Sequence, residues 1–170
     1  MSQDDFASLK ARLQALEDKS AIQETLNRYC QGIDYGFPDQ VVDCFTGEMV
    51  REICRPDGSV NRWEGLVGTR EFANGHSHAP DKYHKHLALN CIIELHGDTA
   101  DVSSYMFRFD AGDGEKSHIW GLGRQQDTMR RDPDGRWRIE KRVTHIEDHW
   151  PGRSRPATGL VAAGAPTSKG

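Results

Sequence analysis

The chain has 170 residues and a mass of 19.1 kDa, which fits one domain with a sizeable core better than two. Its net charge of −4 and the lack of a basic segment argue against a nucleic-acid partner, and no apolar run approaches the roughly 20 residues of a membrane span. The acidic start lacks a signal-peptide pattern, and no two of the four cysteines form a C-x-x-C pair. We therefore expect a cytoplasmic protein with reduced thiols and no membrane partner.

Helical spacing of apolar residues dominates the first part of the chain. A narrow stripe on an otherwise charged helix is formed by Phe6, Leu9, Leu13 and Leu16. We expect residues 1–17 to form a helical arm that lies on the domain or on a neighbouring subunit. A second stripe from Ile22 to Ile33 predicts another helix, loosened at its end by Gly36, and residues 41–45 predict a short third helix.

Strand patterns follow the helices. Residues 50–54 and 60–63 predict a hairpin around a Pro-Asp-Gly turn, and residues 68–78 a further helix. Four long strands joined by Gly/Asp turns are then expected at residues 83–95, 99–110, 117–129 and 137–149. Helices followed by an antiparallel meander indicate an α+β fold: a curved, mostly antiparallel sheet wrapped around the helices as a cone-shaped barrel with an internal pocket.

This order of elements also predicts the domain limits. We expect the cone domain to span residues 18–150. The tail, residues 151–170, is rich in Gly, Ala, Pro and Ser, and we expect it to be flexible unless a partner holds it.

The strand around His86 is the most informative segment for function. Alternation places His86, Ala88 and Asn90 on one face, opposite an apolar face that includes Leu87 and Leu89. A small residue between a histidine and an asparagine leaves space for a ligand. A histidine that is only hydrogen-bonded in a half-exposed sheet is the commoner situation, and spacing alone leaves both interpretations open.

Three further positions are candidates for chemistry. Tyr29 lies on the apolar stripe of its helix, so its buried hydroxyl needs a partner. Asp34 follows at the helix end, where a carboxylate either caps local backbone or points into the pocket. Arg142 lies opposite the face of Trp137 and Ile139 by strand parity, unless a bulge reverses it. His118, just before Trp120, is a weaker candidate.

Metal and nucleotide chemistry have little support. The pairs His76/His78 and His84/His86 have H-x-H spacing, which suits zinc or iron on a strand, but the nearest following acid is Glu94. No Walker loop, G-x-G-x-x-G or G-x-S-x-G motif is present. We expect no metal and no cofactor.

Several short motifs together resemble the SnoaL-like branch of the nuclear-transport-factor-two-like superfamily over about residues 18–147. They are Ala21-Ile22-Gln23, Tyr29, Gly32-Ile33-Asp34, His86-x-x-x-Asn90, Gly97-Asp98-x-Ala100 and Gly135-x-Trp137-x-Ile139. Within that branch the pattern is most similar to cofactor-free lyases, namely scytalone dehydratase, bile-acid 7α-dehydratase and hexachlorocyclohexane dehydrochlorinase.

The resemblance implies roles for particular residues. It places the Asp–His catalytic dyad of those lyases on Asp34 and His86, with Arg142 and Tyr29 as further catalytic groups. We take Asn90, His118 and Trp120 as expected substrate contacts. The chain departs from scytalone dehydratase at Ile33, where that enzyme has a tyrosine.

The function implied is a cofactor-independent lyase acting on a small hydrophobic, oxygenated, aromatic or polycyclic substrate. Water loss and carbon–carbon cleavage with loss of formaldehyde both fit such a dyad. Two other classes stay open: a non-catalytic ligand-binding or oxygenase-type subunit, and a ketosteroid-type isomerase or polyketide cyclase. Related lyases are commonly trimers, so we expect a homo-oligomer, with a trimer favoured.

Overall fold

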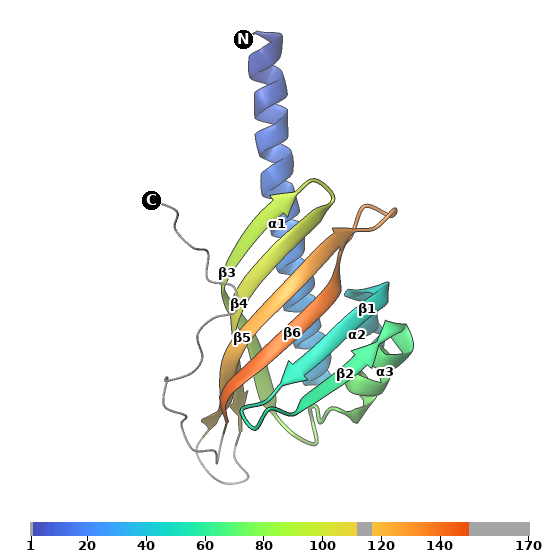
Figure 1. The fold of residues 1–170 in the computed structure, drawn as a ribbon, viewed down its shortest axis with the longest axis vertical. Helices are drawn as coiled ribbons and strands as arrows, with labels where there is room; N and C mark the ends of the chain where they lie inside the picture. The colour runs from blue at the N-terminus through green and yellow to red at the C-terminus, as the bar shows by residue number, and fades with distance from the viewer. Residues whose placement is uncertain (1, 112–116, 150–170) are drawn as a thin grey trace.

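The computed structural model describes residues 2–111 and 117–149. Three helices and six strands follow one another along this part of the chain (Figure 1). The helices are α1 (Gln3–Tyr35), α2 (Pro38–Asp43) and α3 (Gly65–Gly75). The strands are β1 (Phe45–Cys54), β2 (Val60–Glu64), β3 (His84–His96), β4 (Thr99–Asp110), β5 (His118–Arg131) and β6 (Trp137–His149). The predicted tail, residues 151–170, lies outside the described residues.

The strands form one sheet in the order β2-β1-β6-β5-β4-β3, in which every neighbouring pair is antiparallel except the parallel pair β1–β6. The predicted α+β plan, with a curved sheet against N-terminal helices, is confirmed. The expected closure into a barrel is wrong, because β2 and β3 are the two edges of an open sheet. No helix in the described ranges has the length and apolar character needed to cross a bilayer.

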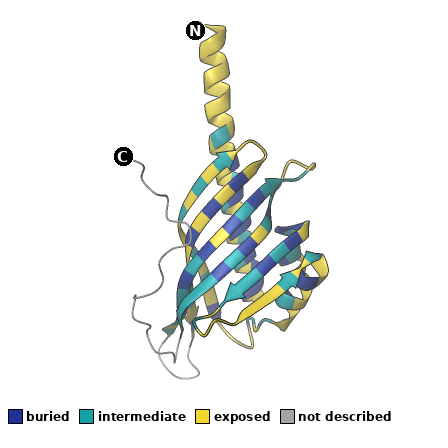
Figure 2. Ribbon diagram, viewed as in Figure 1, coloured by how far each residue is buried: buried dark blue, intermediate teal, exposed yellow. Residues whose placement is uncertain are grey.

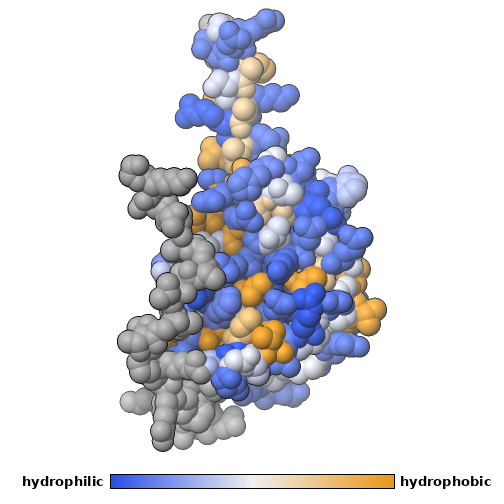
Figure 3. Space-filling model, viewed as in Figure 1, coloured by the Kyte–Doolittle hydropathy of each residue, from blue (hydrophilic) through white to orange (hydrophobic). Residues whose placement is uncertain are grey.

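Helix α1 is continuous, so the two helices expected at the N-terminus are one. At about 1.5 Å per residue its 33 residues extend for roughly 50 Å. Its first half projects beyond the sheet (Figure 1), and apolar side chains lie along one side of it (Figure 3). The second half is amphipathic and covers the concave face of the sheet through Ile22, Leu26, Tyr29 and Ile33.

The core lies between this half of α1 and the inner face of the sheet. Figure 2 shows buried and exposed positions alternating along the central strands, as expected when one face packs and the other meets water. The inward residues that pack on the helix include Phe45, Met49, Val102, Met129 and Ile139.

Two irregularities change which side chains face inward. In β3 the register shifts between Leu89 and Ile92, and Asn90 adopts a left-handed φ of 54°. In β6 the register skips Glu140, so Arg142 points to the same buried side as Ile139. The simple parity that placed Arg142 on the opposite face is therefore wrong, and the bulge considered as its exception is present.

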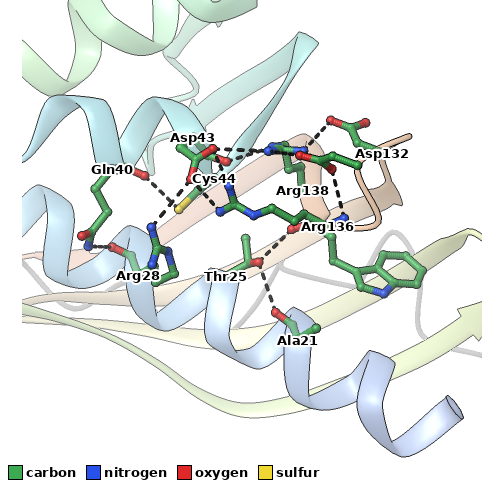
Figure 4. Close-up of polar contacts among 11 residues, drawn as sticks. Ala21, Thr25, Arg28, Gln40, Asp43, Cys44, Asp132, Arg136 and Arg138 are labelled. Atoms are coloured by element: carbon green, nitrogen blue, oxygen red, sulfur yellow. Dashed lines mark hydrogen bonds and ion pairs between the residues drawn. The ribbon is translucent and has the colours of Figure 1, made fainter.

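A polar network joins the short helix α2 to the start of β6. The carboxylate of Asp43 accepts hydrogen bonds from Arg136 and Arg138, and it forms an ion pair with Arg28 (Figure 4). Thr25 Oγ1 donates to the backbone oxygen of Trp137 at 2.8 Å, which ties α1 to the same strand. These contacts fix the position of α1 against β6.

Candidate active site

A cavity of about 230 Å³ opens between the inner face of the sheet and helices α1 and α3. This volume is somewhat below the roughly 300 Å³ at the lower end of ligand pockets, so it suits a small molecule. Its wall is aromatic and cationic, and includes Tyr29, Arg51, Trp63, Phe72, His86 and Trp120. Cys30 also lines it, but burial raises the pKa of this thiol to about 11, which leaves little thiolate for nucleophilic chemistry.

Asp34 and His86 meet at this cavity although 52 positions separate them in the chain. The Nδ1 atom of His86 lies 2.6 Å from Oδ1 of Asp34, and the backbone amide of His86 donates to both carboxylate oxygens at 3.1 and 3.2 Å. The carboxylate is 4% exposed and the imidazole 15%. Asp34 thus binds both the ring and the backbone amide of His86, which fixes the orientation of the imidazole.

Contacts within α1 do not account for a carboxylate at position 34. It lies in the last turn of α1, which ends at Tyr35 and is capped by Gly36 in the left-handed conformation with a φ of 69°. A carboxylate at the negative end of a helix dipole is unfavourable. The hydrogen bonds of its carboxylate go to His86 on β3 and not to local backbone, so the alternative of a local cap is wrong.

The contact with Asp34 determines where the His86 proton lies. An ionised carboxylate only accepts hydrogen bonds, so Nδ1 carries the proton and Nε2 is left as the basic atom. Burial lowers the pKa of His86 below its ordinary value, although the Asp34 charge opposes this shift. The imidazole is therefore neutral at pH 7, the state that a general base requires.

Tyr29 and Arg142 lie side by side, but only Tyr29 lines the cavity. The guanidinium carbon of Arg142 is 4.4 Å from the centre of the Tyr29 ring. Arg142 is 1% exposed and donates through Nε and Nη2 to Asp127 at 2.7 and 2.8 Å. Burial alone would lower the pKa of Arg142, but the Asp127 carboxylate outweighs it and raises that pKa. Arg142 is thus committed to Asp127 beneath the cavity wall.

The sequence reasoning missed Arg51, which lines the cavity from β1. A signal was available, because alternation along β1 puts Arg51 on the same face as Met49 and Ile53. An arginine between two apolar inward positions is unusual on a buried strand face.

The three predicted substrate contacts differ in their position relative to the cavity. Trp120 lines the cavity, and the guanidinium carbon of Arg108 lies 4.5 Å from its ring centre. Asn90 is exposed at the β3 irregularity, and His118 is half-buried at the start of β5. Neither belongs to the residues that line this cavity within the described part of the chain.

Three histidines cluster beside the Asp34 contact. His76, His84 and His86 place one ring nitrogen each within 4.8 Å of one another. Burial lowers the pKa of His76 and of His84 to about 4, so both are neutral and able to ligate a metal. Tetrahedral zinc ligands at about 2.05 Å would lie only about 3.4 Å apart, so the cluster would have to contract. A metal here would also occupy His86, which makes the metal and general-base roles mutually exclusive.

The family model described as a SnoaL-like domain matches residues 14–143 of the chain. The chain belongs to this family. A search of the curated proteins finds no match for this SnoaL-like protein. The resemblance drawn from the short motifs is thereby confirmed at the level of the family.

Solved structures of the same fold carry varied names. An NTF2-like protein with a cystatin-like fold from Novosphingobium aromaticivorans has 23% identity and a TM-score of 0.73, covering 86% of this chain and 93% of that one. Rv3472 from Mycobacterium tuberculosis, of unknown function, has 27% identity and a TM-score of 0.70, covering 90% and 84%. A proposed scytalone dehydratase from N. aromaticivorans has 18% identity and a TM-score of 0.66, covering 88% and 97%. At such identity the last match shows a shared fold.

Proposed function

We propose that this SnoaL-like protein is a cofactor-independent lyase in which His86 is the general base and Asp34 orients it. The observation that carries the proposal is the 2.6 Å contact between His86 Nδ1 and Asp34 Oδ1 at the wall of an aromatic cavity. The similarity to a structure named as a scytalone dehydratase supports the same class of reaction.

In the proposed reaction, Nε2 of His86 takes a proton from a carbon or hydroxyl of the substrate. The Asp34 carboxylate stabilises the imidazolium that forms, as an acid partner does in other histidine-based sites. The protonated ring then returns the proton to a departing hydroxyl, which gives net loss of water, or the same base drives carbon–carbon cleavage with loss of formaldehyde. A positioned base of this kind contributes about 10²–10⁴-fold to the rate.

Tyr29 is the proposed donor to the oxygen on which negative charge develops. Its ring is buried against Phe45 at 5.7 Å between ring centres, so the hydroxyl position is restricted. A single preorganised donor of this type is worth about 3–4 kcal/mol. Arg142 acts as a positioning residue in this proposal, because its charge lies against the Tyr29 ring while its donors are used by Asp127.

The reaction is tested by a mass-resolved screen of hydroxylated one- and two-ring aromatic compounds. A lyase gives products lighter by water or formaldehyde, whereas a product of unchanged mass would favour an isomerase or cyclase. Binding without any conversion would favour a non-catalytic subunit. His86→Ala should lose conversion, and His96→Ala is the matched control, because His96 is an exposed histidine on the same strand.

We also infer a homo-oligomer, with a trimer favoured, built through the projecting half of α1. Four apolar side chains there are between 53% and 67% exposed, namely Phe6, Leu9, Leu13 and Leu16. A second copy of the chain is the simplest cover for such a stripe. Light scattering should give an oligomeric mass that falls in a Leu9→Glu/Leu13→Glu variant, and a monomeric wild type would contradict the inference.

A further inference from the structure

A row of four side chains runs across the sheet at the cavity, and two of them, Arg51 and Trp63, line its wall. Asp127 on β5 is opposite Arg142 on β6, Arg142 is opposite Arg51 on β1, and Arg51 is opposite Trp63 on β2. Register partners share a face of a sheet, and these four point toward the helices. The row therefore brings two buried arginines and one carboxylate together.

The charges in this row do not balance. Both carboxylate oxygens of Asp127 accept a hydrogen bond from Arg142. Arg51 is 4% exposed, and its Nε and Nη1 atoms are buried without a hydrogen-bond partner among the described residues. Two positive groups thus share one negative group, and an uncompensated buried charge is expensive.

Aromatic rings hold the Arg51 guanidinium in place. Its central carbon is 3.9 Å from the centre of the Phe72 ring and 5.2 Å from that of Tyr29. Stacking on ring faces stabilises the cation without supplying a counter-charge. Burial lowers the pKa of Arg51, but the intrinsic pKa of a guanidinium is so high that the group stays charged at pH 7.

The rest of the cavity wall has the same sign of charge. Its described lining residues include Arg55 and Arg108 in addition to Arg51, and none of them is an aspartate or glutamate. Arg108 forms a two-point ion pair with Asp110, and Arg55 hydrogen-bonds to Asn61. Arg51 is thus the buried lining arginine that has no carboxylate partner among the described residues, and a side-chain hydrogen bond with Tyr29 supplies no negative charge.

We infer that the cavity binds an anionic substrate, a one- or two-ring aromatic carboxylate whose negative group offsets the charge of Arg51. The inference deepens the proposed function, since it names the substrate class of the same cavity. The rings would lie among Trp63, Phe72 and Trp120, and a volume of about 230 Å³ suits one or two rings. Arg51 would then determine specificity, while proton transfer stays with His86.

The test compares two probes of matched shape, 2-naphthoate and 2-naphthamide, by calorimetry on the full chain at pH 7. A charge-assisted contact to a buried arginine is worth about 1.5–3 kcal/mol, so wild type should bind the naphthoate about 10- to 100-fold more tightly. Arg51→Gln should remove this preference, and Arg51→Lys, which keeps the charge, should retain part of it. Arg62→Gln is the matched control, because Arg62 is exposed and paired with Glu64.

Equal affinity for the two probes, or no binding of naphthoate up to millimolar concentration, would overturn the inference. If circular dichroism shows that Arg51→Gln does not fold, the ratio of naphthoate to naphthamide affinity in wild type and in Arg51→Lys still tests the inference. This experiment measures binding, so its outcome is independent of the lyase proposal. If the protein binds naphthoate selectively but converts no substrate, the anion site is supported and the lyase proposal is wrong.

Discussion

Replacing Asp34 by asparagine changes one atom of the candidate site and removes its negative charge. In the native site both carboxylate oxygens accept, one from the ring Nδ1 and both from the His86 backbone amide. An asparagine side chain offers one acceptor and one donor. If its NH₂ faces Nδ1, the ring proton must move to Nε2, and the basic atom is lost. If its oxygen faces Nδ1, the NH₂ group opposes the backbone N–H.

The size of the effect follows from the charge that forms during proton transfer. The imidazolium and carboxylate charges are centred about 4 Å apart, and at an effective dielectric constant near 20 their attraction is about 4 kcal/mol. Losing it slows the chemical step by roughly 10³-fold. The wrong tautomer alone costs about 10⁴-fold in a well-studied histidine–aspartate system, so the expected loss in kcat lies between about 10² and 10⁴.

The assay is kcat on a substrate from the mass-resolved screen, with naphthoate affinity and melting temperature measured on the same preparation. Asp34→Asn should lose kcat while its probe affinity stays within about threefold of wild type. Asp18→Asn is the matched control, because Asp18 is a buried carboxylate on the same helix that accepts from Arg131 and Trp137. It should melt earlier and keep kcat. An Asp34→Asn variant with more than about a tenth of wild-type kcat would refute the reasoning.

Three further predictions concern pH and metals. Because burial lowers the pKa of His86 and only neutral imidazole accepts a proton, kcat/KM should rise with pH through an apparent pKa below about 6.5 and then level; activity that falls between pH 5 and 7 would disagree. Burial lowers the pKa of His76 and His84 to about 4, so the stability gained by keeping them neutral is complete above about pH 6.5 and is lost as the pH falls toward 4. The melting temperature should decline over that range, less steeply in His84→Gln, and identical slopes would contradict this. Turnover should withstand chelation with EDTA, whereas loss restored by zinc or iron would assign the three histidines to a metal.

The hairpins of the sheet were predictable because their signals are local. Gly97 and Gly135 adopt φ values of 71° and 81° in the turns expected from their Gly/Asp pairs. The prediction of two separate N-terminal helices was wrong. No glycine or proline lies between residues 1 and 31, so nothing in the sequence ends the helix there. The apolar stripe shifts because the first half of the helix projects beyond the sheet and the second half packs on it. Strand parity failed at Asn90 and Glu140, where a bulge inserts one residue without a reliable local signature.

The candidate site was predictable only in part. The resemblance brought Asp34 and His86 together, whereas spacing alone left a capping role for Asp34, because a contact across 52 positions is set by tertiary packing. Arg51 was missed because its role depends on the ion pair between Arg142 and Asp127. The sequence does not show which of two neighbouring arginines pairs with a single carboxylate. Asn90 was predicted as a contact from an alternation that the β3 irregularity interrupts.

The central claim is that His86 presents an unprotonated Nε2 to the cavity because Asp34 takes the hydrogen bond from Nδ1. Long-range proton–nitrogen NMR on ¹⁵N-histidine-labelled protein at pH 7.5 tests it without any substrate, with His86→Gln used for assignment. We expect the Nδ1–H tautomer for His86, and a change of tautomer population in Asp34→Asn. An Nε2–H tautomer, or a doubly protonated ring at that pH, would contradict it.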